Sequence, residues 1–208
     1  MKRMISATLI AGVVAATAAT VVFSSRIGYE SAAYTVLQSE GDFEVREYPE
    51  LLVAVTPSQV NEQGRDGSFM RLFRYISGGN SEEQKIAMTT PVLMRESADE
   101  ASGAMSFVMP ADVQLDAAPA PTADQVEIRR RAAGRFAVVR FSGRLDESTS
   151  NLNEYTLREW MADRGLIGER FAETAAYDPP FTPGPLRRNE VLIRIIESPV
   201  SKEKEDDR

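Results

Sequence analysis

Two short segments near residue 50 have the spacing of β-strands. Apolar and polar side chains alternate over residues 43–48, and residues 51–56 form an apolar run rich in β-branched side chains. Alternation with a period of two predicts a half-buried strand, and a short apolar run between turn residues is typical of a buried strand. Pro49 and Glu50 lie between the two runs and favour a turn. The pattern therefore predicts a β-hairpin.

Residues 66–76 change to the spacing of a helix. Their large apolar side chains recur at positions i, i+3, i+4 and i+7, which lie on one side of an α-helix. Gly78 and Gly79 follow, as is typical after a helix C-terminus. We therefore expect a helix that packs one apolar stripe on the core. The stripe consists of Phe69, Leu72, Phe73 and Ile76.

Strand patterns return over residues 86–94 and 105–109. Pro91 lies inside the first of them, and because proline cannot donate to a strand ladder we expect an edge or bulged strand there. Residues 112–124 contain an Ala-Pro-Ala-Pro run and few large side chains, which predicts a linker.

The same order of elements then repeats. Strands are predicted over residues 126–129, 136–141, 174–177 and 191–196, and a helix over 151–164 that begins with Asn151 and Glu154 as a capping pair. Each half reads strand, strand, helix, strand, strand, so two ββαββ units predict an α+β domain with pseudo-twofold symmetry. We place this domain at residues 33–199, with halves of about 33–111 and 125–199. A groove between helix and sheet is a usual place for an apolar ligand.

The first 26 residues differ from the rest of the chain. Lys2 and Arg3 precede an uncharged run over residues 4–23. As a helix, this run would span about 30 Å, the thickness of the bilayer hydrocarbon. An uncleaved transmembrane anchor (an N-terminal hydrophobic helix) and a cleaved signal peptide both fit. Either one predicts a domain on the extracytoplasmic, periplasmic side that reaches the membrane only through this segment.

The composition excludes several kinds of chemistry. The chain has 208 residues, with 31 acidic and 24 basic side chains and neither cysteine nor histidine. Disulfides, thiolate or imidazole metal sites and His-containing catalytic triads are therefore excluded. A net charge of −7 argues against nucleic acid as a partner, because its phosphates require clustered Lys and Arg. Residues 200–208 are nearly all charged, which predicts a disordered, solvated tail.

Three segments resemble the SOUL family of haem-binding proteins. They are residues 85–92 (KIAMTTPV), residues 177–180 (YDPP) with residues 187–191 (RRNEV), and residues 43–48 (FEVREY). Their order and spacing are similar to the family over about residues 34–197. The resemblance implies a distorted antiparallel β-barrel flanked by two main helices, a fold shared with gyrase-inhibitor-like small-molecule-binding domains.

The resemblance also implies haem or another tetrapyrrole as the ligand, lying against the first long helix. Apolar side chains would contact the ring, and basic side chains would lie near the propionates. The implied binding residues are Phe69, Met70, Phe73, Arg74, Tyr75 and Met88. Core packing is an open alternative for Phe69 and Phe73. Arg187 and Arg188 either bind a propionate or, with Glu190, hold the last loop by charge pairing.

The histidine ligand proposed for some family members has no counterpart here. Iron could remain unligated or take water, a methionine or a tyrosine, and Met70, Met88 and Tyr75 are the candidates. We therefore predict modest affinity and weak discrimination between haem and metal-free porphyrin. We expect no cofactor to be required for folding.

Three functions fit such a domain. The first is a non-enzymatic carrier or buffer of haem, without catalytic residues. The second is an enzyme of hydrolase or haem-dechelatase type that uses a carboxylate or tyrosine of the groove, such as Glu159. The third is an interaction module for a peptide or lipid. A groove with arginine only at its rim favours the first, and a Tyr/Glu pair with a raised pKa inside it favours the second.

Overall fold

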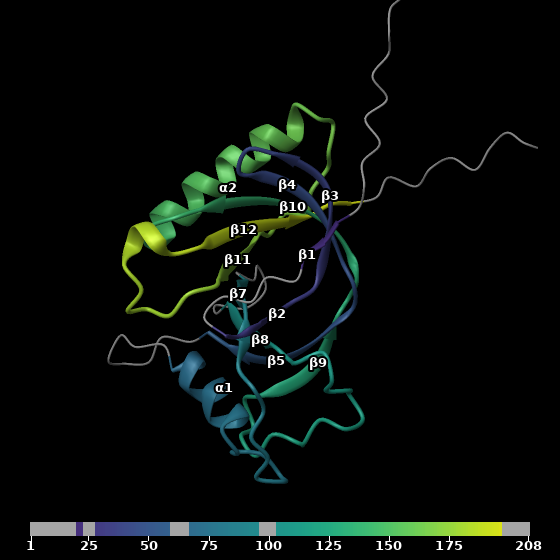
Figure 1. The fold of residues 1–208 in the computed structure, drawn as a ribbon, viewed down its shortest axis with the longest axis vertical. Helices are drawn as coiled ribbons and strands as arrows, with labels where there is room; N and C mark the ends of the chain where they lie inside the picture. Colours follow the sequence, from purple (N-terminus) through teal and green to yellow (C-terminus); the bar gives the residue numbers. More distant parts are fainter. Residues whose placement is uncertain (1–19, 23–27, 59–66, 96–102, 197–208) are drawn as a thin grey trace, which may run out of the picture.

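The computed structural model describes residues 20–22, 28–58, 67–95 and 103–196, and of residues 20–22 only the backbone. These residues form a curled antiparallel sheet, a small parallel pair and two α-helices (Figure 1). The elements are β1 Thr20–Val22, β2 Glu30–Ser31, β3 Tyr34–Glu40, β4 Phe43–Tyr48, β5 Leu51–Pro57, α1 Ser68–Ile76, β6 Thr89–Thr90, β7 Val92–Arg95, β8 Ala104–Val108, β9 Glu127–Arg131, β10 Gly134–Phe141, α2 Glu147–Ala162, β11 Glu173–Ala176, η1 Gly184–Leu186 and β12 Asn189–Arg194.

The order of strands in the large sheet shows the internal repeat of the chain. It runs β1-β3-β4-β10-β12-β11-β7-β8-β5-β9. The last eight strands of this order form four equivalent pairs, one member from each half: β4 with β9, β5 with β10, β7 with β11, and β8 with β12. When the two members of every pair are exchanged, the order of these eight strands is reversed. The pseudo-twofold axis therefore lies between β7 and β11, which pair antiparallel in the middle. The predicted α+β fold, a distorted antiparallel β-barrel flanked by two main helices, is confirmed, and the barrel takes the form of a curled antiparallel sheet that makes a half-barrel.

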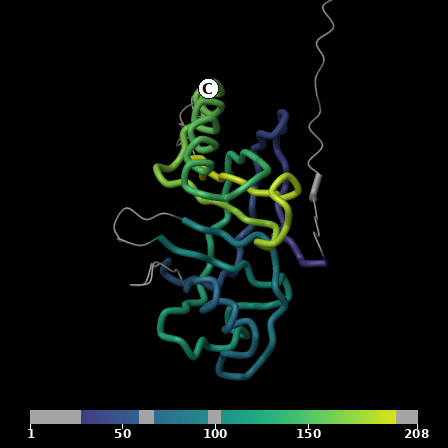
Figure 2. Tube along the Cα trace, turned by 90° about the vertical axis from the view of Figure 1, so that its left-hand side faces the viewer, coloured from purple at the N-terminus to yellow at the C-terminus, as the bar shows by residue number. Residues whose placement is uncertain are grey.

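The two helices occupy equivalent places on the two halves. α1 packs on β5 and β8, and α2 packs on β10 and β12, which are the matching strands. Figures 1 and 2 show the helices at opposite ends of the long axis. Each helix buries three large side chains with the same spacing: Leu72, Tyr75 and Ile76 on α1, and Leu157, Trp160 and Met161 on α2. This shared spacing aligns the helices residue by residue.

The inner face of the curled sheet holds one apolar cluster with buried polar groups beside it. The cluster includes Val53, Leu93, Phe136, Val138 and Leu192, which come from both halves. Two further clusters lie under the helices, one below α1 and one below α2. The sheet thus has apolar packing on both faces.

Several local features differ from the sequence-based expectation. α2 begins at Glu147, not at 151, because the Asp146 carboxylate caps it by accepting from the Thr149 N–H at 3.0 Å. Pro91 lies between β6 and β7. Of the two expectations for this segment, an edge strand or a bulged strand, the edge strand is wrong, because β7 pairs on both sides. The proline occupies the break, where no ladder bond is required of it.

The linker predicted at residues 112–124 packs against the end of α1. Ser81 N–H donates to the Ala120 carbonyl at 2.9 Å, and Asn80 pairs with Pro121. β3 was not predicted, and it extends the sheet beyond β4.

The membrane and tail predictions fall almost entirely outside the described residues. Of the uncharged run, only residues 20–22 are described, and they pair with β3. Within the described ranges, neither helix combines the length and hydropathy that crossing a bilayer requires. Residues 200–208 also lie outside the described part.

Candidate functional site

The outer side of α1 exposes three large apolar side chains. Phe69, Met70 and Phe73 keep 39%, 56% and 42% of their surface accessible, and we call these three residues the α1 patch. The rings of Phe69 and Phe73 lie nearly parallel, with centroids 6.0 Å apart and an interplanar angle of 11°. Phe69 also meets the buried ring of Phe107 edge-on at 5.2 Å. The patch is therefore a flat aromatic surface anchored to the core at one side.

The expectation that Phe69 and Phe73 form the core-facing stripe was wrong. The helix turns Leu72, Tyr75 and Ile76 toward β5 and β8, which leaves Phe69 and Phe73 at the edge of the contact. The apolar arc of α1 is wider than one helix–sheet contact can bury. The sequence pattern locates this arc but not the part of it that faces the sheet.

Two guanidinium groups lie on the same helix without a carboxylate partner among the described residues. Arg71 donates from Nε to the Thr56 hydroxyl at 2.9 Å and from Nη2 to the Pro57 carbonyl, which ties α1 to β5. Arg74 is exposed and lies one turn after Met70. Gly79 allows the Arg74 stem to lie close, because a Cβ at that position would come within 2.9 Å of the Arg74 Cγ. In the described part of the chain, the α1 patch thus has two arginines beside it that no described carboxylate pairs with.

Met88 and Tyr75 lie on the core side of α1. Met88 is half-buried and packs against the apolar cluster under the helix. Tyr75 is buried, and its hydroxyl donates to the Pro119 carbonyl at 2.9 Å. The phenol is therefore engaged with the chain, and of the three candidate iron ligands only Met70 is exposed on the α1 patch.

Arg187 and Arg188 lie apart from this patch, in the loop before β12. Arg187 donates from Nε to the Thr182 carbonyl at 2.7 Å and from Nη2 to the Pro180 carbonyl, so it holds the loop through neutral acceptors. Arg188 donates from Nη2 to Glu190 at 2.6 Å and to the Tyr34 hydroxyl at 3.2 Å. In this arrangement both arginines have structural partners and do not accompany the α1 residues.

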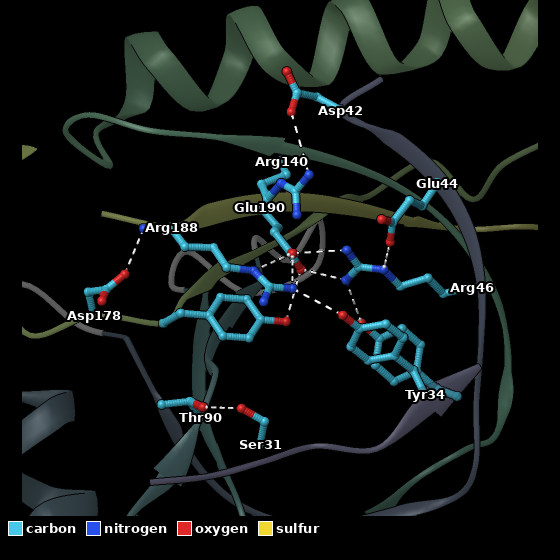
Figure 3. A network of polar contacts seen from close by, with 12 residues as sticks. Ser31, Tyr34, Asp42, Glu44, Arg46, Thr90, Arg140, Asp178, Arg188 and Glu190 are labelled. Atoms are coloured by element: carbon cyan, nitrogen blue, oxygen red, sulfur yellow. Dashed lines mark hydrogen bonds and ion pairs between the residues drawn. The ribbon is translucent and has the colours of Figure 1, made fainter. Parts of the chain in front are cut away.

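A buried polar network inside the curled sheet was not anticipated in full (Figure 3). Glu190 is fully buried and accepts from Arg46, Arg188 and the Tyr177 hydroxyl. Arg46 also pairs with Glu44, and the Tyr48 hydroxyl accepts from it at 3.2 Å. The Arg46 guanidinium stacks 4.2 Å from the Tyr34 ring centroid. The alternating pattern of residues 43–48 placed Arg46 on a strand face but gave no sign of its partner.

The charges in this network shift the pKa values of its members. Burial alone would raise the pKa of the Glu190 carboxyl, but the charges and hydrogen bonds of Arg46 and Arg188 together hold it below its ordinary value. Burial raises the pKa of Tyr48 to about 12, against the opposing charge of Arg46. Burial also raises the pKa of Tyr177, with Glu190 adding to the effect. The carboxylate is ionised and fully paired at neutral pH, which suits a structural group.

The residue proposed for an enzyme, Glu159, lies elsewhere. It is exposed on α2 and accepts a hydrogen bond from the Tyr155 hydroxyl at 2.8 Å. Among the described residues, no group of three or more Asp or Glu side chains is arranged to hold a metal ion. Two cavities are also away from the α1 patch: one of about 230 Å³ beside β2 and β5, and one of about 640 Å³ lined by Tyr34, Tyr48, Arg135 and Arg194.

Comparison with known proteins places the chain in a family. The family model described as SOUL heme-binding protein matches residues 29–194. The chain belongs to this family. Heme-binding protein 1 of Xenopus laevis is 27% identical over 157 residues, which cover 72% of this chain and 81% of that protein. Membership supports a small-molecule tetrapyrrole as the ligand class.

Solved structures extend the likeness at the level of fold alone. The C-terminal domain of EcmrR has a TM-score of 0.55 at 12% identity and covers 75% of this chain and 98% of its own. A hydrolase from Listeria innocua has a TM-score of 0.53 at 10% identity, with coverages of 77% and 94%. At these identities the comparisons support the curled-sheet architecture and carry no activity over to this chain.

Proposed function

We propose that this protein binds haem or another tetrapyrrole on the α1 patch and acts outside the cytoplasm as a non-enzymatic carrier or buffer. Phe69 and Phe73 contact the macrocycle, Arg74 pairs with a propionate, and Met70 is the group within reach of iron. Binding needs no histidine. Met88 supports the patch from the core side, and Tyr75 supports it through its buried ring.

The observation that carries this proposal is the difference between the two equivalent helices. When α1 and α2 are aligned on their buried triads, the stacked pair Phe69 and Phe73 falls on Glu154 and Arg158, which form an ion pair with Nε 2.8 Å from Oε1. The fold therefore accepts a polar pair at these positions. Because folding does not require exposed aromatics there, their presence on α1 points to a ligand.

The two helices also differ in their charged side chains. α1 carries Arg71 and Arg74 and no acidic residue, whereas α2 carries Glu147, Glu154 and Glu159 against a single arginine. In a chain with net charge −7, a basic and aromatic helix is a local exception. A flat apolar ring with two carboxylates is complementary to it, since arginine pairs with carboxylates through its planar fork.

Contact alone can supply the affinity. Each 100 Å² of apolar surface removed from water contributes about 2.5 kcal/mol before association costs are subtracted. Aromatic rings stacked on the macrocycle add to this through their preferred offset geometry. Because this term does not involve iron, metal-free protoporphyrin should bind nearly as well as haem.

The extracytoplasmic placement rests on the N-terminal segment. A positive start followed by the uncharged run over residues 4–23 is the pattern of an exported or anchored protein. Fractionation of cells that express the full chain tests this placement, and recovery of the protein in the cytosol would contradict it.

The test of the ligand site gives α1 the two residue types that α2 has at the equivalent positions. The double variant Phe69→Glu and Phe73→Arg keeps an i, i+4 ion pair that supports the helix, but it removes the aromatic surface. We expect its affinity for hemin and for protoporphyrin, measured by absorption titration of the full chain in detergent, to fall at least tenfold. The matched control is Leu152→Glu on α2, which replaces a 64% exposed apolar side chain and should leave both affinities unchanged.

Two outcomes would contradict the proposal in different ways. If the wild-type chain binds neither porphyrin at micromolar concentration, the tetrapyrrole function is wrong. If the double variant binds as well as wild type while its circular dichroism is unchanged, the site is wrong. The cavity lined by Tyr34, Tyr48 and Arg194 would then be the next place to examine.

A further inference from the structure

The α1 patch can cover only one face of a flat ligand. Its three side chains lie on the outer side of a nine-residue helix, about 14 Å long. Small-molecule sites usually enclose most of the ligand's surface in a cleft, and the two cavities described above lie elsewhere. Within the described ranges, no further surface covers the second apolar face of a macrocycle bound to this helix, so the described part of one chain leaves the site open on that side.

We propose that two copies of this chain enclose one tetrapyrrole between their α1 patches, so that the ligand bridges a dimer. This inference rests on the proposed tetrapyrrole function and adds its stoichiometry. The second copy supplies the same surface: Phe69 and Phe73 against the open face of the ring, and Met70 on the open side of the metal.

The charges of α1 make this dimer dependent on the ligand. Each copy brings Arg71 and Arg74. Arg71 donates to neutral oxygens of Thr56 and Pro57. Within the described ranges, Arg74 has no carboxylate partner. Two empty patches that face one another therefore bring like charges together, which is unfavourable. A porphyrin with two propionates places two negative charges in the same interface, and Arg74 of each copy can pair with one of them.

The size of the patch supports the same conclusion. Stable protein–protein interfaces bury about 1,200–2,000 Å² in total. Three half-exposed side chains on one short helix supply only a small part of that area. The faces of the macrocycle add apolar area on both sides, so the ligand provides most of the contact that holds the copies together.

Iron would have equivalent surroundings on its two sides. Met70 is the most exposed member of the α1 patch at 56%, and each copy contributes one thioether. A methionine sulfur is an established kind of axial haem ligand. Metal-free protoporphyrin lacks this interaction but keeps the ring contacts, so it should also bridge two copies.

The experiment is native mass spectrometry of the full-length chain released from detergent, together with an absorption titration to its end point. Without ligand we expect single chains of 22.9 kDa. With hemin or protoporphyrin we expect a species of two chains and one porphyrin, and an end point at half a porphyrin per chain. The double variant Phe69→Glu and Phe73→Arg should remain a single chain with either ligand, whereas Leu152→Glu should dimerise like wild type.

Each other outcome is decisive. A complex of one chain with one porphyrin, with an end point at one per chain, would overturn the bridged dimer and leave the tetrapyrrole function standing. A dimer of the same size without any porphyrin would overturn the dependence on the ligand. Failure of both porphyrins to bind the wild-type chain would remove the proposed function and the dimer together.

Discussion

Arg46 on β4 and Glu190 on β12, which are 144 positions apart in the chain, form a two-armed ion pair inside the curled sheet. Nη1 of Arg46 lies 2.7 Å from Oε2 of Glu190, and Nη2 lies 3.0 Å from Oε1. Both side chains are almost completely buried. The pair links β4 to β12 across β10, so it joins the first half of the repeat to the second.

Removal of one partner should destabilise the protein strongly. In Arg46→Met the Glu190 carboxylate keeps Arg188 but loses its main counter-charge while it remains buried, a situation that typically costs about 3–5 kcal/mol. Urea unfolding followed by circular dichroism measures this loss. The matched control is Arg130→Met, whose partner Glu50 is exposed, and here the loss should stay below about 1 kcal/mol. Equal losses in the two variants would contradict this prediction, because burial would then not increase the cost of losing one partner.

Ionisation of the buried Tyr48 should lower the free energy of unfolding at alkaline pH. Burial raises its pKa from 10.0 to about 12, so the neutral phenol is favoured in the folded state. The stability from this group is fully present below pH 10 and is lost as the pH rises from 10 toward 12, by up to about 3 kcal/mol. The free energy of unfolding measured between pH 9 and 12 should fall less steeply in Tyr48→Phe than in wild type. A Tyr29→Phe control removes an exposed hydroxyl, and the Tyr48 effect would be refuted if both variants kept the wild-type slope.

Arg74 should contribute to tetrapyrrole affinity through charge. Replacement by Gln removes its pairing with a propionate at an exposed position, where such a pair is worth up to about 1 kcal/mol, or about fivefold in affinity. Absorption titrations at low and high salt measure the affinity, and the difference between wild type and Arg74→Gln should shrink in high salt. Arg144→Gln, which removes an equally charged and highly exposed side chain away from α1, should bind like wild type. If both variants lose the same amount, the effect comes from net charge alone.

A substitution at Met70 distinguishes contact with the porphyrin ring from ligation of the iron. Met70→Leu preserves an apolar side chain of similar volume but removes the thioether. We expect protoporphyrin affinity to change less than twofold, while haem affinity falls and the visible bands of bound haem shift toward those of a more weakly ligated iron. Identical haem spectra for wild type and variant would show that Met70 only packs against the ring. The same change at Met88, which is half-buried in the cluster under α1, should leave the spectrum unaltered.

Local pattern was sufficient for the types and order of most elements. Alternation at residues 43–48 and the 3.6 spacing at residues 66–76 predicted a strand and a helix that the structure contains. The repeat of strand, strand, helix, strand, strand predicted the pseudo-twofold fold, because each unit has a face that only its counterpart can bury. β3 was missed since its second half, Gln38 to Glu40, is polar and follows a register shift near Val36.

Composition and local periodicity, together with motif order, therefore determined the fold class, the family and the absence of histidine chemistry. Only the tertiary structure decided which side of α1 is free, because the apolar arc of the helix is wider than its contact with β5 and β8. It also decided that Arg46 and Arg188 share Glu190 as a partner. Such partners come into contact only when strands distant in sequence pair. The sequence pattern indicates which face of a strand a residue lies on, but it does not indicate which residue lies opposite it in the sheet.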